Sequence, residues 1–177
     1  MIQFEQYSIR PLTIADLENY FGMVEKNRKR LEDYFTGTVS KTTTKADTLA
    51  FLHEITAKRD AKQYFPFVLI DDTSDTFIAF FDLKNIDWNI PKSEIGCYTD
   101  EDFAGKGITA KALHHFVDFV FREFGFRKLF LRTHQSNKAA QIIAERCGFE
   151  LEGHIRMEYK TTSGEIVDLL YYGKLSD

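Results

Sequence analysis

Two glycines, Gly105 and Gly107, stand immediately before a strongly amphipathic segment and have the spacing of an anion-binding turn. The first amides of a helix have no partner within the helix, and glycine lets the preceding backbone direct such amides toward one negative group. A phosphate or pyrophosphate therefore fits this turn. The helix is predicted to begin close to Thr109, because apolar residues recur after it at three- and four-residue spacings: Leu113, Phe116, Val117, Val120, Phe121 and Phe124.

Two common nucleotide-binding motifs compete for this turn. A Walker A loop is excluded, since Gly107 is followed by Ile108 and Gly-Lys-Ser/Thr does not occur in the chain. The segment from Gly105 to Ala110 does satisfy the glycine pattern of a dinucleotide-binding turn. The next predicted strand, 128–133, is however followed by His134, where that motif requires an acid for the ribose. An ordinary tight turn between strand and helix is the remaining alternative.

A second helix is predicted downstream, with Ser136 or Asn137 as its N-cap and Gly148 just past its end. The order of glycine turn, helix, strand, Asn137, helix and Gly148-Phe149 resembles the acetyl-CoA site of the GNAT superfamily of N-acetyltransferases. The similarity extends from Ile9 to the final strand. Within the superfamily, four segments resemble the RimJ/RimL-type ribosomal-protein N-terminal acetyltransferases: Glu94-Ile95-Gly96, Asn137 to Phe149, Glu152-Gly153 and the strand that holds Asp168.

The resemblance implies an α+β fold in one domain, residues 1–177, with a mixed, mostly antiparallel sheet of about seven strands flanked by helices. It also implies that the strand Ile95 to Thr99 splays from the strand Leu129 to Thr133. The backbone groups left unpaired would bind the pantetheine arm and thioester of acetyl-CoA, and the glycine turn would hold the pyrophosphate. The cofactor-binding residues expected from the resemblance are Cys97, Tyr98, Thr99, Ala104, Gly105, Lys106, Gly107, Ile108, Thr109 and Asn137.

N-acetyl transfer needs a neutral amine, an acetyl thioester in line with it, and a group that takes the amine proton. Glu94 is the expected catalytic carboxylate, acting through water, because it lies on the strand that would carry the thioester. Strand alternation places Glu94 and Gly96 on one face and Ile95 and Cys97 on the other. An ordinary exposed or ion-paired strand Glu is the alternative interpretation, and the substitute carboxylates are Asp82, Glu152 and Glu158.

The chain departs from the family pattern at two places. Its phosphate turn has Ala104 where the family usually has Gln or Arg, and Thr109 where it has Gly or Ala, but backbone amides provide most of the binding. On the second helix, Ala140 and Ala144 stand where family members carry a Ser or a Tyr proposed to protonate the leaving thiolate. The sequence therefore assigns no general acid.

Composition is consistent with such an enzyme. The chain has 177 residues, of which 44% are hydrophobic, enough to bury a sizeable core. A formal net charge of -4 argues against nucleic acid as the primary partner and favours an amine or a basic peptide. No apolar run approaches ~18 residues and the N-terminus lacks a signal-peptide pattern, so a cytoplasmic protein without a membrane partner is expected. Cys97 and Cys147 show no metal-ligand spacing, and neither a metal site nor a disulfide is expected.

The remaining elements follow from local patterns. A capping box at Thr13 and Asp16 predicts the first helix. A Thr-rich loop is predicted at 36–44, and a connection without regular structure at 86–91. The other strands and helices are expected at 7–10, 45–58, 65–71, 77–84, 150–160 and 165–175.

The sequence thus predicts an acetyl-CoA-dependent N-acetyltransferase that acts by direct attack of a primary amine. The leading acceptor is a protein N-terminus, including that of a ribosomal protein. Two alternatives stay open: acetylation of a small-molecule amine such as an amino acid, polyamine or antibiotic, and a non-catalytic sensor that binds acyl-CoA. A homodimer is also left open.

Overall fold

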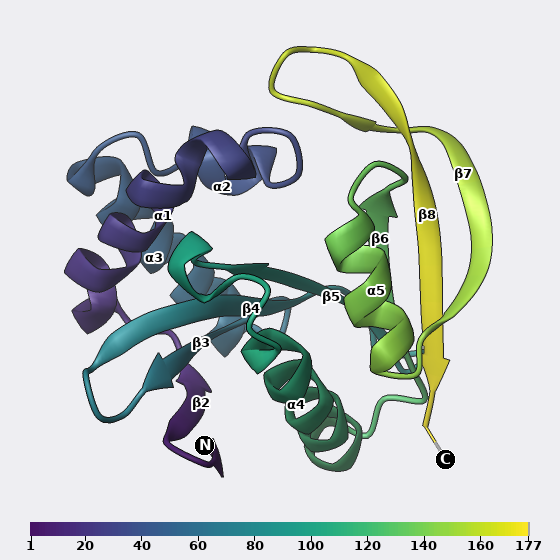
Figure 1. Cartoon of the computed structure of the whole chain (residues 1–177), viewed down its shortest axis with the longest axis horizontal. Coiled ribbons are helices and arrows are strands. Elements are labelled where there is room, and N and C mark those ends of the chain that lie inside the picture. The colour runs from purple at the N-terminus through teal and green to yellow at the C-terminus, as the bar shows by residue number, and fades with distance from the viewer. Residues whose placement is uncertain (177) are drawn as a thin grey trace.

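The computed structural model describes residues 1–176 and contains one eight-stranded sheet in the order β1-β2-β3-β4-β5-β6-β8-β7 (Figure 1). Neighbouring strands are antiparallel except β5 and β6, which are parallel. This confirms the expected mixed, mostly antiparallel sheet. The strands are β1 (Ile2–Phe4), β2 (Tyr7–Pro11), β3 (Phe65–Asp71), β4 (Thr76–Asp87), β5 (Lys92–Thr99), β6 (Lys128–His134), β7 (Glu150–Lys160) and β8 (Ile166–Leu175).

Helices cover both faces of this sheet (Figure 1). They are α1 (Leu17–Leu31), α2 (Thr36–Ser40), α3 (Lys45–Asp60), α4 (Ile108–Phe124) and α5 (Lys138–Arg146), with short 3-10 helices at Ile14–Asp16 and Glu101–Phe103. One face packs against α1 and α3 and the other against α4 and α5. Because β3 is buried on both faces, its sequence is a continuous apolar run: Phe67 and Leu69 join the α4 side, and Val68 and Ile70 join the α1 side.

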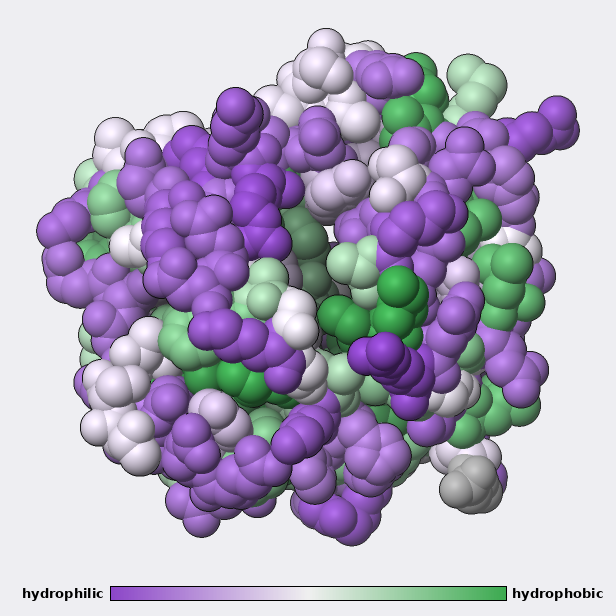
Figure 2. Space-filling model, in the orientation of Figure 1, coloured by the Kyte–Doolittle hydropathy of each residue, from purple (hydrophilic) through white to green (hydrophobic). Residues whose placement is uncertain are grey.

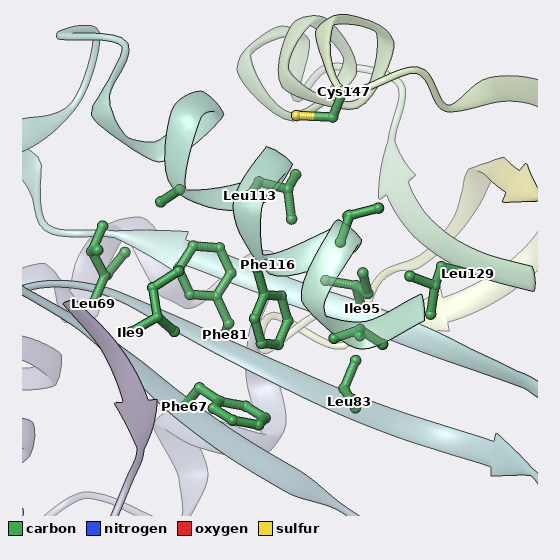
Figure 3. Packing of buried hydrophobic residues seen from close by; sticks show 14 of the residues in the cluster. Ile9, Phe67, Leu69, Phe81, Leu83, Ile95, Leu113, Phe116, Leu129 and Cys147 are labelled. Carbon is green, nitrogen blue, oxygen red and sulfur yellow. The ribbon is translucent and has the colours of Figure 1, made fainter. Parts of the chain in front are cut away.

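Helix α4 is fixed by the apolar stripe that its sequence predicted. Phe116 is fully buried, with its ring centroid 5.0 Å from that of Phe67 and 5.1 Å from that of Phe81 (Figure 3). The helix begins at Ile108, one residue before the expected Thr109. Its position on the sheet therefore places the preceding glycine turn at the end of β5.

The two parallel strands part after a short ladder. Pairing between β5 and β6 runs from Lys92 and Lys128 to Glu94 and Phe130 and extends no further. Beyond that point β5 remains paired with β4, and β6 remains paired with β8. The expected divergence of these strands is present, and it begins at Glu94.

Three local predictions were wrong. Residues 36–40, expected within a loop, form α2, which is held by the buried Val39 and by Arg28, whose guanidinium donates to the Val39 carbonyl at 3.1 Å. Strand β4 continues to Asp87, into the expected connection. Residues 2–4, for which no strand was expected, form the edge strand β1. The centroid of the Phe4 ring lies 4.8 Å from that of the His115 ring on α4. In each case tertiary contacts decide the local structure.

The end of β5 is anchored to α1 by Asp100. Its Oδ1 accepts from Lys26 Nζ at 2.7 Å and from the Asp102 amide at 2.9 Å, and its Oδ2 accepts from Asn27 Nδ2 at 3.0 Å. Burial raises the pKa of Asp100, but these hydrogen bonds outweigh it and hold the pKa below its ordinary value. This buried carboxylate ties the segment before the glycine turn to the α1 layer.

The substitution Asp100→Asn is expected to lower the free energy of unfolding at pH 7 by about 1–3 kcal/mol, because it removes hydrogen bonds to a buried charge. Since the folded pKa is depressed, this contribution is present above the unfolded-state pKa of about 3.9 and is lost as the pH falls through the folded pKa. Denaturant unfolding over a pH series measures both effects. The control Asp60→Asn, at an exposed pair with Arg59, should change stability by less than about 0.5 kcal/mol. A deficit that is the same at every pH would contradict the assignment.

Candidate active site

A cavity of about 980 Å³ opens where β5 and β6 part. Figure 2 shows a hollow near the centre of the face seen in Figure 1. Its walls come from both strands, the glycine turn, α5, the segment between α1 and α2, and α3. The volume lies at the upper end of the range of roughly 300–1,000 Å³ that is usual for small-molecule sites.

The glycine turn borders this cavity. Gly105 and Gly107 have φ values of 75° and 79°, the left-handed region that favours glycine, and no side chain caps the first turn of α4. The hydroxyl oxygens of Thr99 and Thr109 lie 2.7 Å apart and join the end of β5 to the start of α4. The amides at the start of α4 are therefore available to an anion.

Not every residue expected at this turn presents its side chain to the cavity. Ala104, Gly105, Gly107 and Thr109 line it. The ammonium nitrogen of Lys106 lies 5.4 Å from the centroid of the Phe103 ring, and Ile108 packs against the hydrophobic core below α4. Lys106 and Ile108 would contribute backbone groups alone.

Cys97 and Tyr98 occupy opposite faces of β5, as strand alternation requires. Cys97 packs against the core on the α4 side, and burial raises the pKa of its thiol, so the thiol is neutral at ordinary pH. The Tyr98 ring stacks on Phe80 at a centroid distance of 5.1 Å. Its hydroxyl is buried and has no hydrogen-bond partner among residues 1–176. Neither side chain is suited to act as a nucleophile here.

Asn137 begins α5, as expected. Its Oδ1 accepts from the Ala140 amide at 3.2 Å, which leaves its Nδ2 group as a donor. Ala140 lines the cavity, whereas Ala144 is fully buried in the core. The methyl group of Ala140 therefore forms part of the cavity wall, and that of Ala144 lies in the core. Neither side chain can supply a proton.

Glu94 lies in the last β5–β6 pair and lines the cavity, although the residue is only 5% exposed. Its Oε2 accepts from Asn85 Nδ2 at 2.6 Å and from Arg132 Nη2 at 2.9 Å. The other oxygen, Oε1, lies 3.9 Å from Lys84 Nζ. Arg132 Nε also donates to Oε2 at 3.2 Å, so this oxygen is fixed by three donors from two residues, while Oε1 faces an ammonium group.

A bulge in β7 brings two further side chains to the site. The pairing with β8 shifts between Ile155 and Tyr159, and Met157 has a φ of 54°. Bulges re-aim the side chains that follow them. Glu158 pairs with Arg132 at 2.5 Å, and the Tyr159 hydroxyl donates to Thr36 Oγ1 at 2.9 Å.

Tyr159 also accepts from the Thr36 amide at 3.0 Å, and Thr162, in the turn between β7 and β8, donates to the Glu32 carbonyl at 2.5 Å. These contacts join the β7–β8 hairpin to the first residue of α2 and to the turn before it. Residues from both sides of the parted strands therefore meet across the cavity.

Sequence reasoning missed several lining residues: Lys84, Asn85, Arg132, Tyr64 and Tyr159. Asp82 and Glu158 were named as substitute carboxylates. Asp82 lines the cavity, and Glu158 forms an ion pair with Arg132, which also lines it. Glu152, on the outer strand β7, instead forms an ion pair with Lys128 of β6. No local motif marks the missed residues, because their proximity depends on strand pairing and on the bulge.

Comparison with known proteins identifies the fold and the family. The family model described as "Acetyltransferase (GNAT) domain" matches residues 7–150. The chain belongs to the GNAT acetyltransferase family. A probable N-acetyltransferase, YjcK of Bacillus subtilis, is 25% identical over 171 residues, which cover 90% of this chain and 89% of that protein.

Two solved structures share the whole GNAT fold of this chain. The ribosomal-protein-S5-alanine acetyltransferase of Vibrio fischeri has a TM-score of 0.90 at 20% identity, covering 99% of this chain and 96% of its own. The ribosomal L7/L12 α-N-protein acetyltransferase RimL in complex with coenzyme A has a TM-score of 0.88 at 18% identity, covering 97% and 95%. At these identities the likeness establishes the fold.

Family membership makes the chain an N-acetyltransferase that uses acetyl-CoA. The dinucleotide alternative for the glycine turn is thereby set aside. Within residues 1–176, no group of three or more His, Cys, Asp or Glu side chains is arranged to hold a metal ion. No helix in the same range is long and apolar enough to cross a membrane.

The substitution Gly107→Asp is expected to weaken CoA binding at least about tenfold, because it adds a negative charge beside the amides that would hold the pyrophosphate. Gly125→Asp is the matched control: Gly125 lies at the opposite end of α4 with a φ of 67°, and a Cβ at either position would meet no atom within 4 Å. Isothermal titration with CoA compares the two variants. Equal affinities would show that the anion binds elsewhere.

Proposed function

We propose that the chain transfers the acetyl group of acetyl-CoA to the primary amine of a protein N-terminus, with a ribosomal protein as the leading acceptor. The observation that carries the proposal is the parting of β5 and β6 at Glu94, beside a cavity that continues from the glycine turn to a group of charged side chains. Both similar solved structures are named as acetyltransferases of ribosomal proteins, one for an alanine of protein S5 and the other for the α-N position of L7/L12. This supports the substrate class.

The two ends of the cavity suit different roles. The backbone from Gly105 to Thr109 would hold the pyrophosphate, the Asn137 Nδ2 group would donate to the pantetheine arm, and the β5 edge freed after Glu94 would hold the thioester. Acetyl-CoA, when bound, supplies the activated acetyl group. The chain then has to orient an amine against that group and take its proton.

Glu94 is proposed to take that proton, directly or through a water molecule. Arg132 and Asn85 hold its Oε2 in place, so that Oε1 can face the acceptor. A carboxylate fixed in this way keeps Oε1 within reach of the proton that it would accept. The leaving thiolate is proposed to depart without a dedicated acid, since Ala140 lines the wall and free thiols are only modestly basic, with a pKa near ~8.5.

The substitution Glu94→Gln is expected to lower kcat by about 10²-fold or more while it leaves CoA affinity nearly unchanged, because it keeps the shape and removes proton acceptance. Steady-state kinetics with a peptide bearing a free N-terminus, together with CoA titration, measure both. Glu152→Gln, on the outer strand, is the control and should keep full activity. If Asp82→Asn or Glu158→Gln abolished turnover and Glu94→Gln did not, the base would have to be reassigned.

The substitution Ala140→Ser should change the rate of the chemical step by less than about tenfold, or roughly 1.4 kcal/mol, if no general acid is needed. For the same reason, the pH profile of the native protein should show no descending limb below about pH 8.5. Single-turnover rates of both forms decide the point. A much larger gain would mean that the native chain lacks a needed acid, and it would favour a role as a sensor of acyl-CoA.

A further inference from the structure

The acceptor end of the cavity contains an ammonium group, Lys84, on the same sheet face as Glu94. In the β4–β5 ladder Lys84 pairs with Glu94, and Asp82 pairs with Gly96, so all four residues share one face. Gly96 leaves room for the two β4 side chains: a Cβ there would lie 2.2 Å from Asp82 Oδ1 and 2.7 Å from Lys84 Nζ. Lys84 is therefore held above β5 just after it parts from β6.

Within residues 1–176, Lys84 has charged neighbours but no acceptor at an ordinary hydrogen-bond distance. Its Nζ lies 3.5 Å from Asp82 Oδ1 and 3.9 Å from Glu94 Oε1, both longer than an ordinary hydrogen bond to a carboxylate. Asp82 Oδ1 is buried without a hydrogen-bond partner among residues 1–176, while the Tyr64 hydroxyl donates to Oδ2 at 2.7 Å. The side chain of Lys84 is 31% exposed, and the residue lines the cavity. Its donors are thus available to a bound molecule.

The ammonium stays charged in this position. Burial lowers the pKa of Lys84, but the negative charges of Asp82 and Glu94 outweigh it, and the pKa lies above its ordinary value. The other groups that face it are the Arg132 guanidinium, which is itself paired with Glu94, and the ring of Phe35 at 5.9 Å. Lys84 therefore acts as a hydrogen-bond donor and as a positive charge, but not as a base.

These positions restrict what a bound amine can carry. If the reacting amine lies at Glu94 Oε1, as the proposed function requires, the Lys84 ammonium, 3.9 Å from that oxygen, is within reach of a substituent on the carbon next to the amine-bearing carbon of the acceptor. An oxygen on that carbon would receive a charge-assisted hydrogen bond. An alkyl group there would leave the ammonium without an acceptor, and a second ammonium, as in a polyamine, would be repelled.

We propose that Lys84 is the specificity-determining residue of the acceptor site and selects primary amines that carry an oxygen acceptor on the carbon next to the amine-bearing carbon. This inference rests on the proposed function. A protein N-terminus has such an oxygen in its first carbonyl group. Amino alcohols and free amino acids share the same chemistry and are separated by the test.

The test compares two amines of almost the same shape. Alaninol and 2-aminobutane differ by a hydroxyl in place of a methyl group. The native protein should favour alaninol by at least about tenfold in kcat/KM, and Lys84→Met should bring the ratio close to one, mainly by raising KM for alaninol. Lys84→Arg should retain part of the preference. The control Lys111→Met removes an exposed pair with Glu5 on the outside of α4 and should keep the native ratio.

Further substrates identify the source of the oxygen. The values of kcat/KM are compared for alaninamide, alaninol and alanine. The highest value for alaninamide supports a peptide N-terminus as the acceptor, and the highest value for alanine supports a free amino acid. Spermidine as the preferred acceptor of the native protein would overturn the inference. A Lys84→Met variant that keeps the alaninol preference would also overturn it. So would a variant whose kcat/KM falls equally for alaninol and 2-aminobutane, since an equal loss indicates a structural role.

Failure of the proposed function would give a different result. If CoA binds but no amine is acetylated, the proposed function falls and the role of Lys84 can still be measured. Ligand-observed NMR on the CoA-bound protein compares the binding of alaninol and 2-aminobutane to the native form and to Lys84→Met. A preference for alaninol that disappears in the variant supports the inference, and equal binding of both amines to the native protein overturns it.

Discussion

The parting of two parallel strands is the constraint on which the rest of this structure depends. Each backbone amide and carbonyl that leaves a ladder needs another partner if it is buried. The chain limits the number of such groups, because β5 keeps its second ladder with β4 and β6 keeps its second ladder with β8. Only the facing edges beyond Glu94 and Phe130 are released. A sheet interrupted in this way offers a ligand an extended backbone surface in its interior.

The helices that flank the gap keep it open. Helix α4 is fixed to the sheet by the packing of Phe116, and the thiol of Cys147, just after α5, donates to the Ala110 carbonyl on α4 at 3.4 Å. Both helices are thus positioned by apolar contacts below and by each other. The polar groups at their first turns remain at the cavity, because the core occupies the opposite sides of the helices. Hydrophobic packing and anion binding consequently use different faces of the same helix.

The sequence specified those parts of the site that are local in the chain. A glycine turn before an apolar-faced helix, and an asparagine cap before the next helix, are recognisable because each depends on a few consecutive residues. Most of the strands were also predictable, from apolar runs and from the turn residues that bound them. The short elements β1 and α2 were not predictable, because contacts with distant residues decide them. Phe4 of β1 packs against Tyr7 and His115, and α2 is held by Arg28.

The charged end of the cavity was least predictable. Lys84 and Arg132 meet Glu94 only through the register of three strands, and the β7 bulge at Met157 has no glycine to mark it.

The cavity is closed in two physically different ways. On one side is the backbone ladder that ends at Glu94 and Phe130, and on the other are the hydroxyl contacts of Tyr159 with Thr36 and of Thr162 with Glu32. A ladder inside a sheet opens only if the sheet is disrupted, whereas side-chain hydroxyls exchange their partners with water at little net cost in free energy. The ladder therefore holds one wall of the cavity permanently, whereas the hydroxyl contacts are the part of its boundary that water can most readily replace.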